Sequence, residues 1–184
     1  EQFGKGDKYV GVAMVMATMP GLPMFAHGQI EGFTEKYGME YQRAYYNELP
    51  DQRLIERHER EIFPILKKRY LFSQVAQFEL LDYVGADGYT CDDVFIYANR
   101  AGEERALMCY NNRYEISNGK IGRSVPKAGI NGEESKGRSL NEVLGLKKDE
   151  NSFYILKEHR SGLEFLRSGA ELHEPGMHLG LQGY

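Results

Sequence analysis

The chain of 184 residues has no tryptophan and only two cysteines, Cys91 and Cys109. Their spacing does not form a metal-type pair. Both fall on neighbouring predicted strands, in a register that places them diagonally rather than opposite one another. We therefore expect two reduced, structural thiols, a usage typical of a cytoplasmic protein.

The sequence also lacks a positive charge excess and a long hydrophobic run. Its net charge of −4 argues against nucleic acid as a partner. The apolar stretch from Tyr9 to Met19 is about half of the roughly 20 residues that a membrane span needs, and no signal peptide is visible. The hydrophobic share of 41% and the charged share of 27% are those of a soluble globular protein.

Familiar catalytic signatures are missing as well. The sequence has no G-x-S-x-G, no phosphate-binding loop and no H-E-x-x-H. His58 falls on the apolar stripe of a predicted helix, which favours a core histidine over a ligand. His159, His173 and His178 have no metal-ligand spacing. We predict no catalytic residue, no metal site and no cofactor within this chain.

The first part of the chain has an α/β pattern. Asp7 is a good helix N-cap, and Lys8 to Met19 is apolar nearly all round, so this helix should be covered on most faces. Pro20-Gly21 ends it. The short continuous apolar run Leu22 to Ala26 predicts a parallel strand that is buried on both faces.

A second helix should begin after Asp51, its predicted cap. Its apolar positions recur at helical spacing, and charged residues fill the opposite face. Pro64 should kink this helix, because proline removes a backbone donor and crowds the preceding turn.

After Ser73 the pattern becomes that of antiparallel β-structure. The turn sequences "GADG" and "NRAGEE" separate the first three runs, and Asn118-Gly119 is a further turn signal. Ser139 and Glu142 form a capping box for a short helix that ends at Gly145. The predicted strands are Phe78 to Val84, Asp93 to Asn99, Glu104 to Asn111, Phe153 to Glu158, Leu163 to Arg167 and Met177 to Leu181.

These patterns predict two domains with a boundary near Ser73 to Gln77. Residues 1–75 form the α/β part, and residues 76–184 form an all-β antiparallel part with a mobile loop near 122–138. The sequence starts immediately before a helix and ends within a predicted strand. We therefore expect a piece of a larger protein.

Three polar residues follow the predicted strand directly: His27, Gln29 and Glu31. One interpretation is that they satisfy the backbone groups of a tight turn. The other is that they line the rim of a binding site. Spacing alone leaves both interpretations open.

Several stretches resemble one family, the C-terminal part of large bacterial α-amylase-like glycoside hydrolases. The most specific are "GLPMFAHGQIEGF" and "EKYGMEY", followed by "RHEREIFPILKKRYLF". "DDVFIYANRAGEERALMCYNN" and "HRSGLEFLRSGAELHEPGMHLGL" are weaker. The resemblance runs over essentially the whole chain, apart from the predicted loop.

The resemblance implies the last helix–strand–helix of a (β/α)₈ barrel, followed by a small antiparallel β-sandwich. Gly21, Pro23 and Gly28 match the family pattern around the eighth strand. Gln29 replaces the acidic residue that usually follows this glycine. Because active sites lie at the C-terminal ends of barrel strands, the resemblance implies that His27, Gln29 and Glu31 are substrate-binding residues that face an α-glucan or oligosaccharide.

The carboxyl groups that such a hydrolase needs for a retaining mechanism lie on earlier strands of the family's barrel. We therefore expect this chain alone to be inactive. Glu35, Glu40 and Glu48 are interpreted as a solvated acidic face. Their neighbours Tyr37, Tyr41 and Tyr45 either pack beneath the loop or stack on sugars.

A different class of function remains open, that of a non-catalytic β-sandwich module that binds carbohydrate or protein. Exposed aromatic side chains on the sandwich would favour such a module, whereas we expect Phe95, Tyr97 and Tyr110 to point inward. The isolated barrel piece should also self-associate through residues 8–30, since one strand and two helices cannot bury their own apolar surface.

Overall fold

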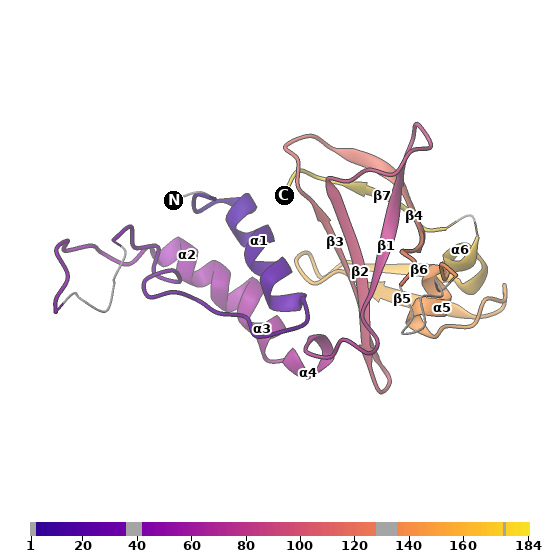
Figure 1. Ribbon diagram of the computed structural model, residues 1–184, viewed down its shortest axis with the longest axis horizontal. Coiled ribbons are helices and arrows are strands. Elements are labelled where there is room, and N and C mark those ends of the chain that lie inside the picture. Colours follow the sequence, from indigo (N-terminus) through magenta and orange to yellow (C-terminus); the bar gives the residue numbers. More distant parts are fainter. Residues whose placement is uncertain (1–2, 36–41, 128–135, 175) are drawn as a thin grey trace. The chain divides into compact units, whose positions relative to one another are not determined.

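The computed structural model describes residues 3–35, 42–127, 136–174 and 176–184. The chain forms two compact units, residues 1–69 and residues 70–184, which are described separately (Figure 1). The first unit is helical. The second is built mainly from antiparallel β-strands.

The first helix, α1 (Asp7–Thr18), confirms the predicted N-terminal helix, with Gly6 rather than Asp7 as the N-cap. Asp7 instead lies in the first turn, where its negative charge is favourable near the helix N-terminus. Val10, Ala13 and Ala17 are buried along one side. The helix ends before Pro20-Gly21, as predicted.

The second helical stretch consists of α2 (Gln52–Arg57), a π-helical turn η1 (His58–Ile62), α3 (Phe63–Leu66) and α4 (Arg69–Phe72). The Asp51 side chain accepts a hydrogen bond of 3.2 Å from the backbone N–H of Leu54 and caps α2 as predicted. The irregularity that Pro64 should cause takes the form of the π-helical turn directly before it. Within this wider turn the N–H of Phe63 bonds to the carbonyl of His58, which accommodates the proline ring and its missing donor.

The predicted buried strand Leu22 to Ala26 is not a strand in this chain. The segment has no regular secondary structure, and Leu22 and Met24 are 84% and 73% exposed. A parallel strand requires neighbouring strands, and residues 3–35 and 42–69 contain none. The prediction of burial on both faces is therefore wrong for this chain.

The second unit contains a five-stranded antiparallel sheet in the order β3-β2-β1-β4-β7. The first three strands in chain order confirm the predicted strands that begin at Phe78, Asp93 and Glu104. The outer strands β3 and β7 approach each other: the N–H of Tyr184 donates to the carbonyl of Asn111 at 3.0 Å, so the sheet is nearly closed. The strands are β1 (Glu79–Gly85), β2 (Val94–Ala101), β3 (Glu104–Asn111), β4 (Ser117–Ser124) and β7 (His178–Leu181).

Strand β4 corrects two predictions. Asn118-Gly119 is not a turn but part of this strand, and residues 122–124 of the predicted mobile loop also belong to it. A Cβ at Gly119 would lie 2.4 Å from the carbonyl oxygen of Val84 and 2.9 Å from the ring of Tyr83. Glycine at this position therefore allows the neighbouring strands to approach each other closely. Residues 128–135 of that loop lie outside the described part of the chain.

The remaining elements are α5 (Leu140–Leu144), α6 (Gly169–His173) and a separate hairpin of β5 (Phe153–Lys157) and β6 (Glu164–Ser168). The predicted capping box of Ser139 and Glu142 is present, and Gly145 ends α5 with φ of 66°. Helix α6 was not predicted. Its sequence signal is a second capping box, formed by Ser168 and Glu171.

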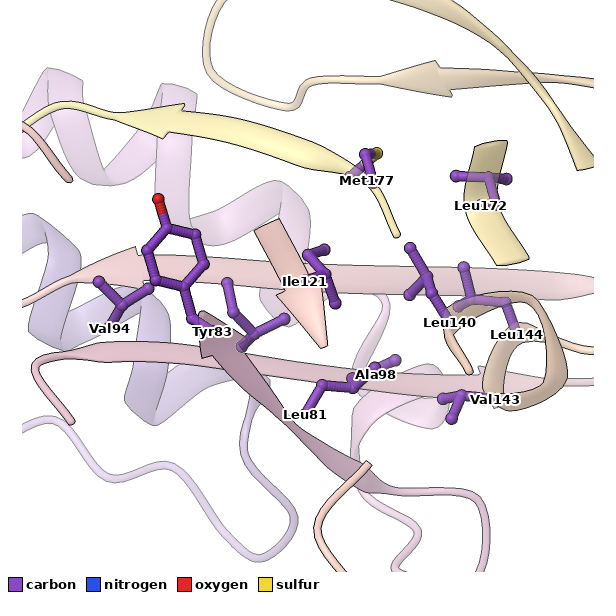
Figure 2. Close-up of a cluster of buried hydrophobic side chains, with 11 residues drawn as sticks. Leu81, Tyr83, Val94, Ala98, Ile121, Leu140, Val143, Leu144, Leu172 and Met177 are labelled. Carbon is purple, nitrogen blue, oxygen red and sulfur yellow. The ribbon is translucent and has the colours of Figure 1, made fainter. Parts of the chain in front are cut away.

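The main core lies between one face of the five-stranded sheet and the two short helices (Figure 2). Leu81 and Ile121 come from the sheet, and Leu140 and Leu172 come from α5 and α6. Ile121, Leu140 and Leu172 are at most 1% exposed, which makes this cluster the main hydrophobic contribution to the stability of the second unit.

The aromatic residues of β2 and β3 lie on the opposite face of the sheet. Val94, Ile96 and Ala98 join the core, so the alternating positions Phe95 and Tyr97 point the other way. Tyr97 is buried, with its ring 5.5 Å from that of Phe78. Phe95 is 42% exposed, so the prediction that it points inward is wrong.

Candidate functional site

The turn after the extended segment carries the three predicted substrate-binding residues. The Gln29 side-chain oxygen accepts a hydrogen bond from the N–H of Ala26 at 3.0 Å, and the N–H of Gln29 donates to the Ala26 carbonyl at 3.1 Å. Gly28 has φ of 71°, and a Cβ there would come within 2.7 Å of Phe33. The side chain of Gln29 thus stabilises a tight turn, which was one of the two interpretations from the sequence.

His27 and Glu31 lie on either side of Gln29 on the same turn. The exposed imidazole of His27 has its ring centre 6.4 Å from that of Phe33. Glu31 is half-buried, and its backbone carbonyl accepts a hydrogen bond from the N–H of Asp51 at 2.8 Å. This bond joins the turn to the start of α2. Substrate binding by His27, Gln29 and Glu31 remains a prediction.

A buried tyrosine–histidine pair lies behind this turn. The Tyr9 hydroxyl is 2.8 Å from Nε2 of His58, and Nδ1 of His58 is 2.9 Å from the carbonyl oxygen of Leu54. A carbonyl only accepts, so Nδ1 of His58 donates to Leu54. His58 is fully buried, which confirms the prediction of a satisfied core histidine.

The surroundings of this pair are mainly apolar. The ring centres of Phe25 and Phe63 lie 6.0 Å and 5.9 Å from that of His58. Burial raises the pKa of Tyr9 above its ordinary value. The Tyr9 hydroxyl also lies 3.4 Å from the backbone carbonyl of Gln29. It therefore connects α1, the π-helical turn and the turn that carries the candidate site.

Two carboxylates hold the loop that follows. Glu48 accepts hydrogen bonds from the N–H and the hydroxyl of Thr34, both at 2.8 Å. Glu35 accepts bonds from the N–H groups of Tyr45 and Tyr46, at 2.7 Å and 2.9 Å. Hydrogen bonds from the backbone of Thr34 and Glu35 lower the pKa of Glu48.

These contacts lie at the exposed surface, so Glu35 and Glu48 fit the interpretation of a solvated face, and both carboxylates also bind backbone groups. Glu40 lies outside the described residues, as do Tyr37 and Tyr41. Tyr45 is 74% exposed, so it does not pack beneath the loop. No sequence spacing marks the link between Glu35 and Tyr45, because the partners are 10 positions apart in the chain.

Ser139 and His173 of the second unit resemble a nucleophile with its base. Nδ1 of His173 lies 3.0 Å from the Ser139 hydroxyl, a distance that suits such a pair. However, Ser139 is only 2% exposed, and its hydroxyl bonds to Asn141 and Glu142 at 2.7 Å and 2.8 Å. These contacts assign the group a structural role at the start of α5.

Metal binding and membrane insertion find no support in the described residues. Among residues 3–35, 42–127, 136–174 and 176–184, no cluster of three or more His, Cys, Asp or Glu side chains could hold a metal ion. In the same part of the chain, no helix has the length and apolar character to cross a membrane. Cys91 and Cys109 are both free thiols.

In comparisons with known proteins, no protein-family model, no curated protein and no solved structure matches this chain. The turn with His27, Gln29 and Glu31 is held by a well-defined set of hydrogen bonds.

Proposed function

We propose that this chain is the C-terminal part of an α-amylase-like glycoside hydrolase that acts on α-glucosidic linkages by a retaining mechanism. The first unit supplies the last helix–strand–helix of its (β/α)₈ barrel, and the second is an accessory antiparallel β-sandwich domain. Support comes from the resemblance of "GLPMFAHGQIEGF" and "EKYGMEY" to that family. The two free cysteines agree with a cytoplasmic location.

One structural observation carries the proposal: the segment Leu22 to Ala26 is apolar, yet it presents Leu22 and Met24 outward. It is also anchored at both ends. Before it, the Arg69 guanidinium binds the carbonyl of Met19 at 3.1 Å. After it, Gln29 closes the turn at Ala26. An apolar segment that is held in place but left exposed is what a buried parallel strand would become without its neighbours.

In the proposed hydrolase, the turn after this segment lies on the active-site face of the barrel. His27 is the exposed polar side chain of the turn and would contact sugar hydroxyls, while Gln29 keeps the turn in shape. Hydrolysis with retention needs two carboxyl groups at a defined separation. We assign both to earlier strands of the parent barrel. In this proposal the chain helps to bind the substrate and to shape the site, but it does not catalyse.

The experiment compares this chain with the protein encoded by its complete gene, using starch, maltodextrins and nitrophenyl glucosides. We expect turnover by the complete protein only, and a higher KM in its His27→Ala variant. A complete protein without activity on any α-glucoside would overturn the proposal. So would activity that purifies with this chain and disappears in its Glu31→Gln variant.

A second candidate is a non-catalytic module that binds carbohydrate or protein through the sheet. The observation that favours it is a series of neighbouring aromatic rings that begins with Phe95 and Tyr110 on the face opposite the core. The ring of Phe95 stacks on Tyr110 with centres 6.2 Å apart, and Tyr184 lies 6.5 Å from Tyr110 and 4.7 Å from Tyr114. Phe95 and Tyr114 are 42% and 83% exposed.

Affinity electrophoresis in gels that contain soluble glucan tests this second candidate. If the sheet binds glucan, the gel should retard the wild-type chain. The Phe95→Ala and Tyr114→Ala variants should be retarded less. Tyr89→Ala is the matched control, because Tyr89 is 76% exposed and lies outside the aromatic series. Equal mobility of all four proteins with and without glucan would exclude glucan binding by this face.

A further inference from the structure

We propose that the second unit binds a phosphate group between Arg100 and Arg105. The two arginines lie directly opposite each other on the neighbouring strands β2 and β3. Residues in such a pair have Cβ atoms about 4.5–5.5 Å apart, and two like charges at this position destabilise the sheet. An anion bound between the two side chains would remove this repulsion.

The two guanidinium groups converge at the end of α5. Nε of Arg105 donates a hydrogen bond of 2.7 Å to the carbonyl oxygen of Leu144. Nη1 of Arg100 reaches the following residue, since a Cβ at Gly145 would lie 2.3 Å from this nitrogen. Both side chains therefore end beside the same two consecutive residues, and the lack of a side chain at Gly145 leaves room for Arg100.

The protein holds both arginines in place before any ligand binds. Nε of Arg100 donates to the side-chain oxygen of Gln77 at 2.8 Å, as Nε of Arg105 does to Leu144. Both residues are half-buried. Because a guanidinium group that is already oriented loses less conformational freedom on binding, this arrangement favours the capture of an anion.

The carboxylates nearby neutralise this pair only in part. Among the described residues, no carboxylate forms an ion pair with Arg100. Arg105 has Glu103, with Oε2 3.6 Å from Nη2, but the Glu103 side chain is 98% exposed, and exposed ion pairs contribute little. The carboxylate of Glu104 accepts a hydrogen bond of 2.5 Å from the Tyr70 hydroxyl. An excess of positive charge therefore remains at the end of α5.

The charge and shape of the site favour phosphate over a carboxylate. A phosphate group carries a charge of about −1.5 to −2 at neutral pH, which balances two guanidinium groups. Its oxygens point in several directions and can accept from both arginines, whereas a planar carboxylate matches the fork of a single arginine. Lys147 and Lys148 follow α5 at exposed positions and add to the attraction for an anion. The site lies within the second unit and does not depend on the proposed hydrolase.

The test is an NMR titration of the ¹⁵N-labelled chain with inorganic phosphate at neutral pH and constant ionic strength. We expect the Nε–H signals of Arg100 and Arg105 to move together and to saturate with one dissociation constant. Acetate should move them far less, because it is planar and carries a single charge. A parallel titration with phenyl phosphate identifies the source of the group: tighter binding of the ester indicates an organic phosphate, and tighter binding of the free ion indicates inorganic phosphate.

Three variants separate a built site from a general effect of charge. Arg100→Gln should weaken phosphate binding by about tenfold or more, because it removes hydrogen bonds from a charged donor. Glu103→Gln should strengthen binding, since it removes the carboxylate that competes for Arg105. Arg113→Gln is the matched control: it removes the same charge from β-structure of the second unit, but Arg113 already pairs with Asp93, so phosphate binding should not change.

Arg100→Lys replaces Arg100→Gln if the latter does not fold. It keeps the charge but loses the planar fork, and it should also weaken binding. The inference would be overturned if the Arg100 and Arg105 signals did not respond to phosphate, or if acetate moved them equally. It would also be overturned if the substitutions at Arg100 and Arg113 weakened binding to the same extent.

Discussion

The guanidinium of Arg69 donates a hydrogen bond of 2.8 Å to the carbonyl oxygen of Ala17 in the last turn of α1. The same guanidinium also binds the carbonyls of Met19 and Gly21. The last carbonyls of a helix have no intrahelical partner. A residue from the second helical stretch therefore caps the first helix and fixes the chain where the exposed extended segment begins.

We expect Arg69→Ala to destabilise the first unit by about 1–3 kcal/mol, the usual cost of losing hydrogen bonds from a charged donor. Amide hydrogen exchange in the last turn of α1 should accelerate accordingly. Arg53→Ala is the control, since Arg53 lies exposed on α2. Equal exchange rates in the two variants would contradict the capping role.

The capping box of α5 predicts a pH dependence of stability. Hydrogen bonds from the backbone N–H and the hydroxyl of Ser139 lower the pKa of Glu142 below its ordinary value of 4.5. Since the pKa is lower in the folded state, Glu142 contributes stability above its unfolded-state pKa. That contribution is lost as the pH falls through the folded-state value.

Chemical denaturation at neutral pH and below pH 4.5 measures this contribution. Glu142→Gln should lower stability at neutral pH and reduce the loss on acidification, whereas Glu150→Gln, at an exposed position, should do neither. Ser139→Ala should cost about 1–2 kcal/mol, as the loss of an N-cap does. If the stability of the Glu142→Gln variant depended on pH as that of the wild type does, the capping box would not be the source of the pH dependence.

The Cys109 thiol should be unreactive in the folded chain. Burial raises the pKa of Cys109 to about 12, although the residue as a whole keeps some exposed surface. The thiolate is the reactive form, so alkylation of Cys109 near neutral pH should require unfolding. Mass spectrometry of the native chain treated with iodoacetamide checks this, with Cys109→Ser as the control. Rapid labelling of native Cys109 would show that its thiol is accessible.

The exposed extended segment predicts self-association. Leaving Leu22 and Met24 exposed forfeits roughly 1.5–3 kcal/mol of burial for each side chain, and a segment of this kind can pair with a second copy. We expect a dimer through residues 8–30 at micromolar concentration, which sedimentation velocity measures. The double variant Leu22→Lys, Met24→Lys should be monomeric, while Tyr89→Lys, exposed on the second unit, should still dimerise. A monomeric wild-type chain would refute this prediction.

The helices and hairpins could be predicted because their signals are local. Asp51, which caps α2, lies only three residues before its partner Leu54. Ser139 and Glu142 are equally close in sequence. The alternation of β2 likewise follows from neighbouring residues, although it did not reveal which face carries the core. The alternation of Phe95 with its neighbours predicts an inward side chain, but the helices α5 and α6 cover the other face of the sheet.

The remaining features depend on contacts between distant residues. The N–H of Tyr45 donates to Glu35 and the N–H of Thr34 donates to Glu48, between residues that are 10 and 14 positions apart in the chain. Asn118-Gly119 is typical of a turn, yet the backbone carbonyl of Val84 requires a glycine at that point in a strand. The pairing of Tyr9 with His58 spans two helices, and its only sequence signal was a histidine on an apolar stripe.

The strand order of the second unit also determines when its parts can assemble. β1, β2 and β3 are consecutive neighbours, so they can pair as soon as they are synthesised. β4 joins β1 early, but its other edge waits for β7, which follows α5, β5, β6 and α6 in the chain. The Tyr83 hydroxyl likewise waits for the Leu179 carbonyl, which it meets at 2.9 Å. Non-local pairing of this kind slows folding. During synthesis, the second edge of β4 therefore remains unpaired until β7 has been made.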